Sequence, residues 1–267
     1  MATAFRTSNP ALNEKTFAPE RLHGLRLPDR APPGQAPAGP DWRTTMTLDG
    51  VVMKSLFLIA LVVAAGAFGW QATERSELGV ELPSWLFLVL IGALGVAVLT
   101  IFKPLLARYT APLYAVLEGA FLGALSAAYE FRFDGIVLQA VGLTVGVFVV
   151  MLLAYASRLI KVTERFRLGV VAATGAVAVV YLVTLVMRLF GADVPFVHDT
   201  GLIGILFSLA VVTIAALNLV LDFDFIEQGV ARQAPKQLEW YAGFGLLVTI
   251  VWLYLELLRL LSKLRSR

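Results

Sequence analysis

The chain has 267 residues, of which 58% are hydrophobic and only 15% are charged. Soluble domains usually carry about 25% charged residues, so this composition excludes an ordinary soluble protein. The chain has no cysteine, which excludes disulfides, thiol catalysis and thiolate metal sites. The small net charge of +3 is explained by Lys and Arg in short loops, so no nucleic-acid binding is expected.

Residues 1–50 differ from the rest of the chain. They have few large apolar residues, charges of both signs and seven of the twelve prolines. Such a segment cannot bury enough surface to offset its ordering entropy, so we expect a disordered N-terminal tail. A short amphipathic piece, Met46–Lys54, is expected at the membrane interface. His23 in this tail and His198 in a later link lie outside the apolar blocks, which excludes a histidine-rich metal centre in the membrane.

Residues 51–267 contain seven apolar blocks of roughly 20 residues, the length that crosses a hydrocarbon core about 30 Å thick. The sequence therefore predicts an all-α fold, a polytopic bundle of seven transmembrane helices in the cell membrane, with the lipid bilayer as its partner. No strand pattern stands out. The predicted spans are 52–71, 84–102, 112–130, 136–156, 168–190, 202–222 and 240–261.

Lys and Arg gather in every second link between these spans. Links 2–3, 4–5 and 6–7 are basic, whereas links 1–2, 3–4 and 5–6 carry more acidic residues. By the positive-inside rule the basic links and the N-terminus face the cytoplasm. The C-terminal tail conflicts with this pattern, because Arg259, Lys263, Arg265 and Arg267 would then lie outside. Either the tail violates the rule or the last block does not fully cross; its length and the interfacial pair Trp240–Tyr241 favour seven spans.

The pattern Gly-x-x-x-Gly occurs at Gly119/Gly123 in the third span and at Gly142/Gly146 in the fourth. Small residues at this spacing let two helices approach closely. Packing within the bundle is the favoured interpretation and a dimer face the alternative, so the chain is expected to be a monomer or a small homo-oligomer.

Ionisable residues inside a span are costly and are therefore candidates for function. Glu118 lies in the third span, roughly 10 Å from its cytoplasmic end. Asp222 and Asp224 lie where the sixth span is expected to reach the cytoplasm, with Asn218 one turn earlier. Glu256 lies in the seventh span, roughly 24 Å from the cytoplasmic side.

These depths predict which side chains can meet. Glu118 and Asp222 share the cytoplasmic half and would form one site if the third and sixth spans are neighbours. Two close carboxylates in a low dielectric repel, so they would share a proton or a hard cation such as Ca²⁺. Glu256 is expected to pair with Arg259, three residues on along the same helix.

Other polar residues are assigned structural roles. Asp224 and Glu227 are expected to be solvated at the end of the sixth span, and Asp222 would be solvated too if it stands at the helix end.

An enzyme is not expected, because no intramembrane Ser–His pair, His-Glu-x-x-His motif or paired Gly-x-Gly-Asp motif occurs. No tightly bound cofactor is expected, and Ca²⁺ enters only as a possible permeant ion.

Several segments, in their order along the chain, resemble the Bax inhibitor-1/YccA family of integral membrane proteins. The resemblance covers roughly residues 50–262 and is closest to a bacterial branch with a longer N-terminal tail. The segments are Tyr114–Gly123 (YAVLEGAFLG), Ile136–Phe148 (IVLQAVGLTVGVF), Leu202–Leu209 (LIGILFSL), Leu219–Gln228 (LVLDFDFIEQ) and Leu253–Leu261 (LYLELLRLL).

The resemblance implies a seven-helix membrane protein that acts as a pH-sensitive calcium leak channel, gated by a carboxylate pair on the sixth and seventh spans. Asp222 is the first member of that pair. If LYLE (residues 253–256) is matched to the family pattern, Glu256 is the second member of the pair. If LLR (residues 257–259) is matched instead, Thr249 takes the position of the second member, and Thr249 lies nearer mid-membrane. With Thr249 in that place, Glu118 becomes the partner of Asp222.

Two other functions stay open. The family resemblance also allows a non-conducting modulator of a membrane protease or of a stress response, acting through the N-terminal tail. A proton-coupled transporter is the third possibility.

Overall fold

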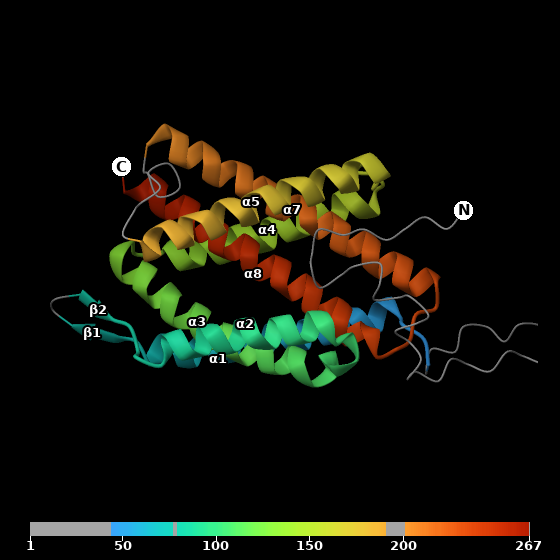
Figure 1. Cartoon of the computed structure of the whole chain (residues 1–267), viewed down its shortest axis with the longest axis horizontal. Helices are drawn as coiled ribbons and strands as arrows, with labels where there is room; N and C mark the ends of the chain where they lie inside the picture. The colour runs from blue at the N-terminus through green and yellow to red at the C-terminus, as the bar shows by residue number, and fades with distance from the viewer. Residues whose placement is uncertain (1–43, 77–78, 191–200, 267) are drawn as a thin grey trace, which may run out of the picture.

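The computed structural model describes residues 44–76, 79–190 and 201–266, and in them the chain forms seven α-helices (Figure 1). Six are long and apolar enough to cross a membrane, and α2 is a shorter apolar helix of 17 residues. These seven helices are the seven predicted spans in order, so the predicted helical membrane bundle is confirmed. They are α1 (Leu48–Gln71), α2 (Leu86–Phe102), α3 (Ala107–Arg132), α4 (Ile136–Ala156), α5 (Glu164–Leu189), α7 (Leu202–Ala231) and α8 (Leu238–Arg265).

Most predicted spans are shorter than the helices that form. α3 begins five residues before the predicted start, after the 3₁₀ turn Pro104–Leu106, so Pro112 lies inside the helix and not in its first turn. α5 begins at Glu164, so Arg165 and Arg167 belong to the helix and not to a link. α7 continues nine residues past Asp222, which overturns the prediction that Asp222 stands at a helix end.

The link between α1 and α2 contains a feature for which the sequence showed no pattern. Strands β1 (Glu74–Ser76) and β2 (Gly79–Glu81) pair antiparallel, with Glu74 opposite Glu81. The hairpin projects beyond one end of the bundle (Figure 1). Three-residue strands are too short to show a period-two pattern, which is why periodicity did not reveal them.

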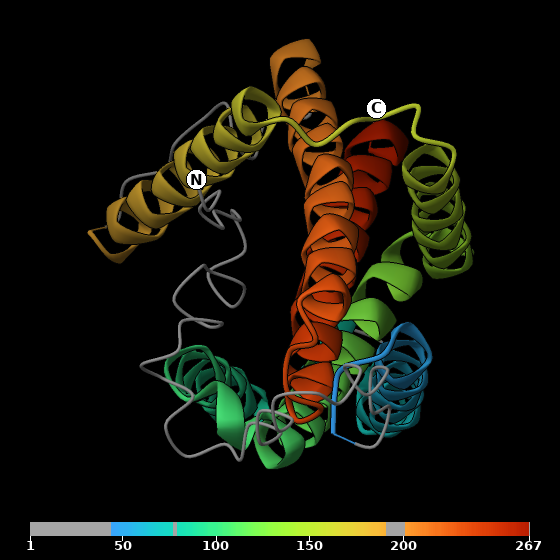
Figure 2. The same ribbon diagram turned by 90° about the vertical axis from the view of Figure 1, so that its right-hand side faces the viewer.

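α8 is the central helix. It packs on α1, α3, α4 and α7, and Figure 2 shows α7 and α8 side by side, with α1 and α4 on one side and α2 and α5 on the other. Buried residues make up 56% of the most apolar stretch of α8 and 17% of the corresponding stretches of α1, α4 and α5. The outer helices therefore turn apolar side chains outward, including Phe87, Leu88 and Leu138, as a lipid environment requires.

Local hydrogen bonds fix where two helices begin. Thr47 is the N-cap of α1, and its hydroxyl accepts a bond from the Gly50 amide at 3.0 Å. At the start of α4, Gly135 has φ +73°, and the Glu130 carboxylate accepts bonds from the Gly135 and Val137 amides. Glu130, which lies in the last turn of α3 and not in a link, therefore caps the start of α4.

Residues 44–46, just before α1, form backbone hydrogen bonds with the link between α7 and α8. The Met46 amide donates to the Ala234 carbonyl at 2.7 Å, and Thr45 pairs with Pro235 in a β-bridge. Met46 is 2% exposed, and residues 48–54 already belong to α1. The predicted interfacial piece is therefore a packed helix start, while residues 1–43 of the predicted tail lie outside the described residues.

The two ends of α8 show that it runs the full length of the bundle. Its first turn contacts the start of α1 through Glu239, and at its other end Arg265 donates to the Asp134 carbonyl in link 3–4. Lys263 and Arg259 also bond within the bundle, so these basic side chains are bound groups and not free tail charges.

The two glycine pairs differ. A Cβ atom at Gly119 or Gly123 would overlap the Val62 or Gly66 backbone of α1, so this pair packs α3 against α1 within the chain. No heavy atom lies within 4 Å of a Cβ built at Gly142 or Gly146. Packing inside the bundle is confirmed for the pair in α3 and is wrong for the pair in α4, which faces outward.

Candidate functional site

Asp222 and Asn218 lie one turn apart in α7, well inside the helix. Asp222 is 0% exposed and Asn218 is 2% exposed. The Asn218 amide nitrogen donates to the Thr174 hydroxyl of α5 and to the Ile214 carbonyl, both at 2.8 Å. The structure therefore buries this carboxylate and fixes its polar neighbour against α5.

Glu118 lies in the middle of α3 and is 8% exposed, with Tyr114 one turn before it. α3 packs on α1, α2 and α8 but makes no extensive contact with α7 within the described chain. Both residues are buried as predicted, and α8 packs against each of their helices. The shared site of Glu118 and Asp222 stays a prediction.

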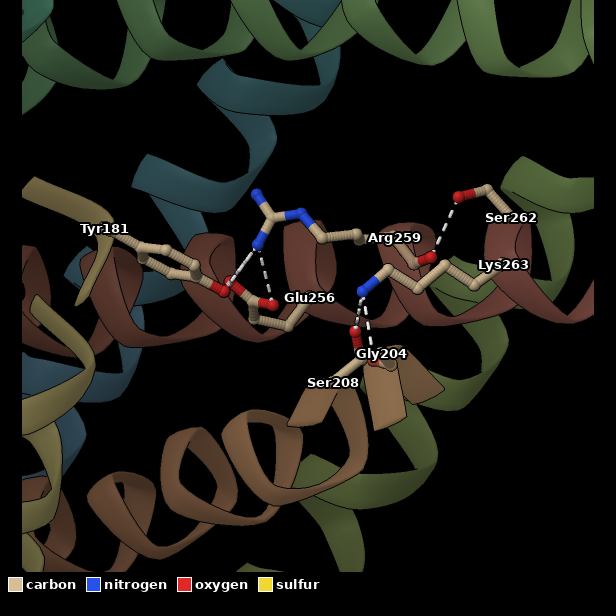
Figure 3. A network of polar contacts seen from close by, with 7 residues as sticks. All are labelled: Tyr181, Gly204, Ser208, Glu256, Arg259, Ser262 and Lys263. Carbon is tan, nitrogen blue, oxygen red and sulfur yellow. Dashed lines mark hydrogen bonds and ion pairs between the residues drawn. The ribbon is translucent and has the colours of Figure 1, made fainter. Parts of the chain in front are cut away.

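Glu256 forms a compact network with α5 (Figure 3). Arg259 Nη1 lies 2.8 Å from Glu256 Oε1 and 2.9 Å from Oε2, which confirms the predicted pair. The Tyr181 hydroxyl donates to Glu256 Oε1 at 2.8 Å and accepts from Arg259 Nη1 at 2.6 Å. Tyr181 thus joins α5 to α8 at an intramembrane carboxylate.

Lys263 forms a second contact of α8, this time with the first turns of α7. Its Nζ donates to the Ser208 hydroxyl at 2.9 Å and to the Gly204 carbonyl at 3.0 Å (Figure 3). Ser208 is 0% exposed and Lys263 is 5% exposed. This bond fixes the register between the antiparallel helices α7 and α8.

The register shows which residue of α8 stands level with Asp222. Asp222 lies 14 residues beyond Ser208 in α7, and Thr249 lies 14 residues before Lys263 in α8, about 21 Å in each case. Asp222 and Thr249 therefore lie within about one helical turn of the same level. Glu256, seven residues further along, stands about 10 Å away, so it is at a different depth. Thr249 is 3% exposed and donates to the Gly245 carbonyl.

Asp224 and Glu227 both have bonded partners; the prediction that they are solvated is wrong for Asp224, whereas Glu227 keeps a partly exposed side chain. Asp224 Oδ2 accepts from Arg167 at 2.7 Å and from Gln228 at 2.6 Å, and the Asp224 side chain keeps 17% exposure. Glu227 accepts from Tyr155 and from Arg158, and its side chain is 41% exposed. Hydropathy could not show this, because the basic partners lie on other helices and links.

One face of α5 carries polar residues seven positions apart. Arg167, Thr174 and Tyr181 contact Asp224, Asn218 and Glu256, in that order. The three α5 residues span about 21 Å along the helix, most of a hydrocarbon core. We call these six residues, with Arg259, the polar seam; it joins α5 to α7 and α8 across the bundle.

Sequence reasoning missed Glu239, a fully buried carboxylate at the start of α8. It accepts from the Thr47 amide and hydroxyl and pairs with Lys54 of α1. Trp240 lies beside Lys54, whose Nζ is 5.6 Å from its ring centre, and Tyr241 is 0% exposed. The predicted interfacial pair is therefore wrong for Tyr241. No local sequence signal links Lys54 to Glu239, because they lie 185 positions apart. The only sign was that Glu239 stands in the first turn of a helix, where the helix dipole stabilises a negative charge.

The described residues contain no group of three or more His, Cys, Asp or Glu side chains that could hold a metal ion. Comparison with curated proteins finds no match. The model of one protein family, described as Bax inhibitor 1 like, matches residues 5–266, which is nearly the whole chain. This match agrees with the bundle of seven apolar helices and with the motifs around Glu118, Asp222 and Glu256. The chain belongs to the Bax inhibitor 1 like family of membrane proteins.

Proposed function

We propose that the protein provides a passive, pH-sensitive path for cations, with Ca²⁺ as the permeant ion, along the polar seam between α5 and the α7–α8 pair. The observation that carries the proposal is the burial of Asp222, which is 0% exposed in the interior of a helix long enough to cross the membrane. A charged side chain in this setting is costly and marks ion pathways more often than it serves structure.

The chemistry of the seam suits a hard cation. Ca²⁺ binds oxygen ligands from carboxylates, amide carbonyls and water. A permeating ion must also be able to leave each site, so a full set of protein ligands is not required at any one of them. Asp224 and Glu256 belong to the seam, and Asp222 lies one turn beyond Asn218 of the seam, so carboxylates occur at successive levels of α7 and α8. Asp222 and Glu256 stand about 10 Å apart along the bundle, and Asn218, one turn from Asp222, offers an amide oxygen between these levels.

Two arginines supply the proposed gate. Arg167 pairs with Asp224 at 2.7 Å, and Arg259 pairs with Glu256 at 2.8 Å. A cation can take either carboxylate only when it displaces the arginine. Protonation removes the carboxylate charge that attracts each arginine, so acid is expected to change the strength of both pairs and with it the flux.

Glu118 remains a separate part of the proposal. Glu118 lies on α3, which packs on α8 but makes no extensive contact with α5 or α7 within the described chain. We therefore assign the main path to the seam and Glu118 to an accessory role. The proposal involves no catalytic step, and it places the N-terminus and the basic links on the cytoplasmic side.

Calcium flux into proteoliposomes tests the proposal. Asp222→Asn should reduce flux by about tenfold or more, the effect expected from the loss of roughly 1.4 kcal/mol of ion stabilisation. The matched control is Asp134→Asn, the same change at an exposed residue of link 3–4, which should leave the flux unchanged. Wild-type flux no greater than that of empty liposomes between about pH 6 and 8 would reject conduction and favour a non-conducting modulator of a membrane protease.

A further inference from the structure

A cleft of about 230 Å³ lies on the side of α8 away from the polar seam. Four helices form it: α1, α3, α4 and α8. α1 and α4 each pack on α8 but make no extensive contact with each other within the described chain, and Figure 2 shows them apart on that side of the bundle. Leu247, Val251 and Tyr254 line the cleft from α8, at the helical spacing that places them on one face.

The cleft has an exposed rim and a buried floor. At the rim, Val63 is 66% exposed and Val145 is 56% exposed. On the floor, Leu122, Thr144 and Val251 are each 6% exposed. The rim belongs to the outward surface of α1 and α4, which face lipid in a membrane-spanning bundle, so the cleft continues the lipid-facing surface inward.

The chemistry of the lining determines what can fill it. The hydroxyls of Ser126 and Tyr254 bond to each other at 2.6 Å, and the Thr144 hydroxyl donates to the Ala140 carbonyl at 2.8 Å. These side chains are therefore already satisfied, and the remaining lining is apolar. The volume would hold several waters, at roughly 30 Å³ each, but a buried water needs two to four polar partners. An empty cleft would forfeit dispersion contacts along its whole wall.

We propose that this cleft is a binding site for one acyl chain of a bilayer phospholipid. The chain enters between α1 and α4 and lies against the face of α8 opposite Thr249 and Glu256. The inference concerns lipid binding alone and does not depend on the proposed cation path.

Photolabelling in vesicles tests the proposal. The full chain is reconstituted in phosphatidylcholine vesicles that contain a phosphatidylcholine with a diazirine at mid-chain, irradiated, digested and mapped by mass spectrometry. Lipids around the protein can reach the rim, but only a chain inside the cleft can reach Val251 and Leu247. We expect label on the α8 segment 247–254 of the wild-type protein.

Two tryptophan variants on one helix separate the site from the surrounding lipid. Val145→Trp fills the cleft mouth and should reduce the label on the α8 segment 247–254 by about tenfold, a change equal to roughly 1.4 kcal/mol. Val149→Trp places the same bulk one turn further on, at a residue 44% exposed that does not line the cleft, and should leave that label unchanged.

Three results would overturn the proposal. They are wild-type label confined to rim residues, equal floor label in the two variants, and floor label obtained with a free photoactive fatty acid but not with the phospholipid. The wild-type comparison of floor with rim needs no substitution, so it decides the matter even if Val145→Trp fails to fold.

Discussion

At the residue scale, two buried or part-buried ion pairs join distant parts of the described chain. Glu239 with Lys54 joins the start of α8 to the start of α1, and Arg167 with Asp224 joins α5 to α7. A buried pair adds little net stability compared with apolar packing, but loss of one partner leaves the other charge uncompensated. Such pairs therefore fix which helix ends meet.

Glu239→Gln is expected to destabilise the protein. Loss of one partner of a fully buried pair costs about 3–5 kcal/mol, and because the Lys54 side chain keeps 19% exposure we expect about 2 kcal/mol. Denaturant unfolding in mixed micelles measures the effect. The control is Glu164→Gln, whose side chain is 59% exposed beside Arg167 and which should change stability by less than about 0.5 kcal/mol. Equal effects of the two variants would contradict the role assigned to Glu239.

At the element scale, the close approach of α1 and α3 depends on glycine. Gly123 faces the Gly66 backbone at a distance that leaves no room for a Cβ atom, whereas Gly146 in α4 faces open space. The same substitution should therefore have opposite effects at the two positions.

Gly123→Ala should destabilise the protein by about 1–3 kcal/mol, because overpacking forces the two helices apart. Gly146→Ala should instead stabilise it by about 0.5–1 kcal/mol, because alanine loses less backbone entropy in a helix interior. The same micelle unfolding assay applies. A Gly123→Ala variant as stable as Gly146→Ala would show that α1 and α3 do not approach as described.

The helices themselves could be predicted from sequence, because apolar blocks of spanning length leave few alternatives. Their ends could not. Hydropathy ends the sixth span at Asp222, yet α7 continues because Arg167 of α5 bonds Asp224 and Arg158 of the link after α4 bonds Glu227. Burial of Asp222, Glu118 and Glu256 also follows from their position in apolar blocks.

Which carboxylates meet depends on the order of helices around α8, which no local pattern contains. Tyr181 shows the same limit: a single tyrosine in an apolar span gives no sign that it bonds Glu256 and Arg259. Arg167, Thr174 and Tyr181 are spaced seven residues apart and so share one face of α5. This spacing becomes informative only once their partners on α7 and α8 are known.

At the scale of the whole molecule, the link charges and the path of α8 predict one orientation in the membrane. We expect the basic links and the N-terminus on the cytoplasmic side. The C-terminal end of α8 lies beside link 3–4, so we expect it on the other side. The chain contains no cysteine, so single cysteines can report sidedness without background.

Ser266→Cys should react with a membrane-impermeant maleimide in intact cells, whereas Lys161→Cys in the link between α4 and α5 should react only after permeabilisation. Both positions are exposed, so access to the thiol differs only by membrane side. Labelling of both cysteines from the same side would contradict the seven-crossing orientation.

The central claim is that cations move along the polar seam between α5 and α7–α8, and a cross-link across the seam tests it most directly. Thr174 and Asn218 meet at 2.8 Å, and Thr174→Cys with Asn218→Cys places one thiol on each side in a chain with no other cysteine. Calcium flux into proteoliposomes is measured after oxidation and again after reduction, with each single variant as control. We predict that oxidation abolishes flux in the double variant alone and that reduction restores it. Equal flux in the oxidised and reduced double variant, with the disulfide shown to have formed, would contradict passage along the seam.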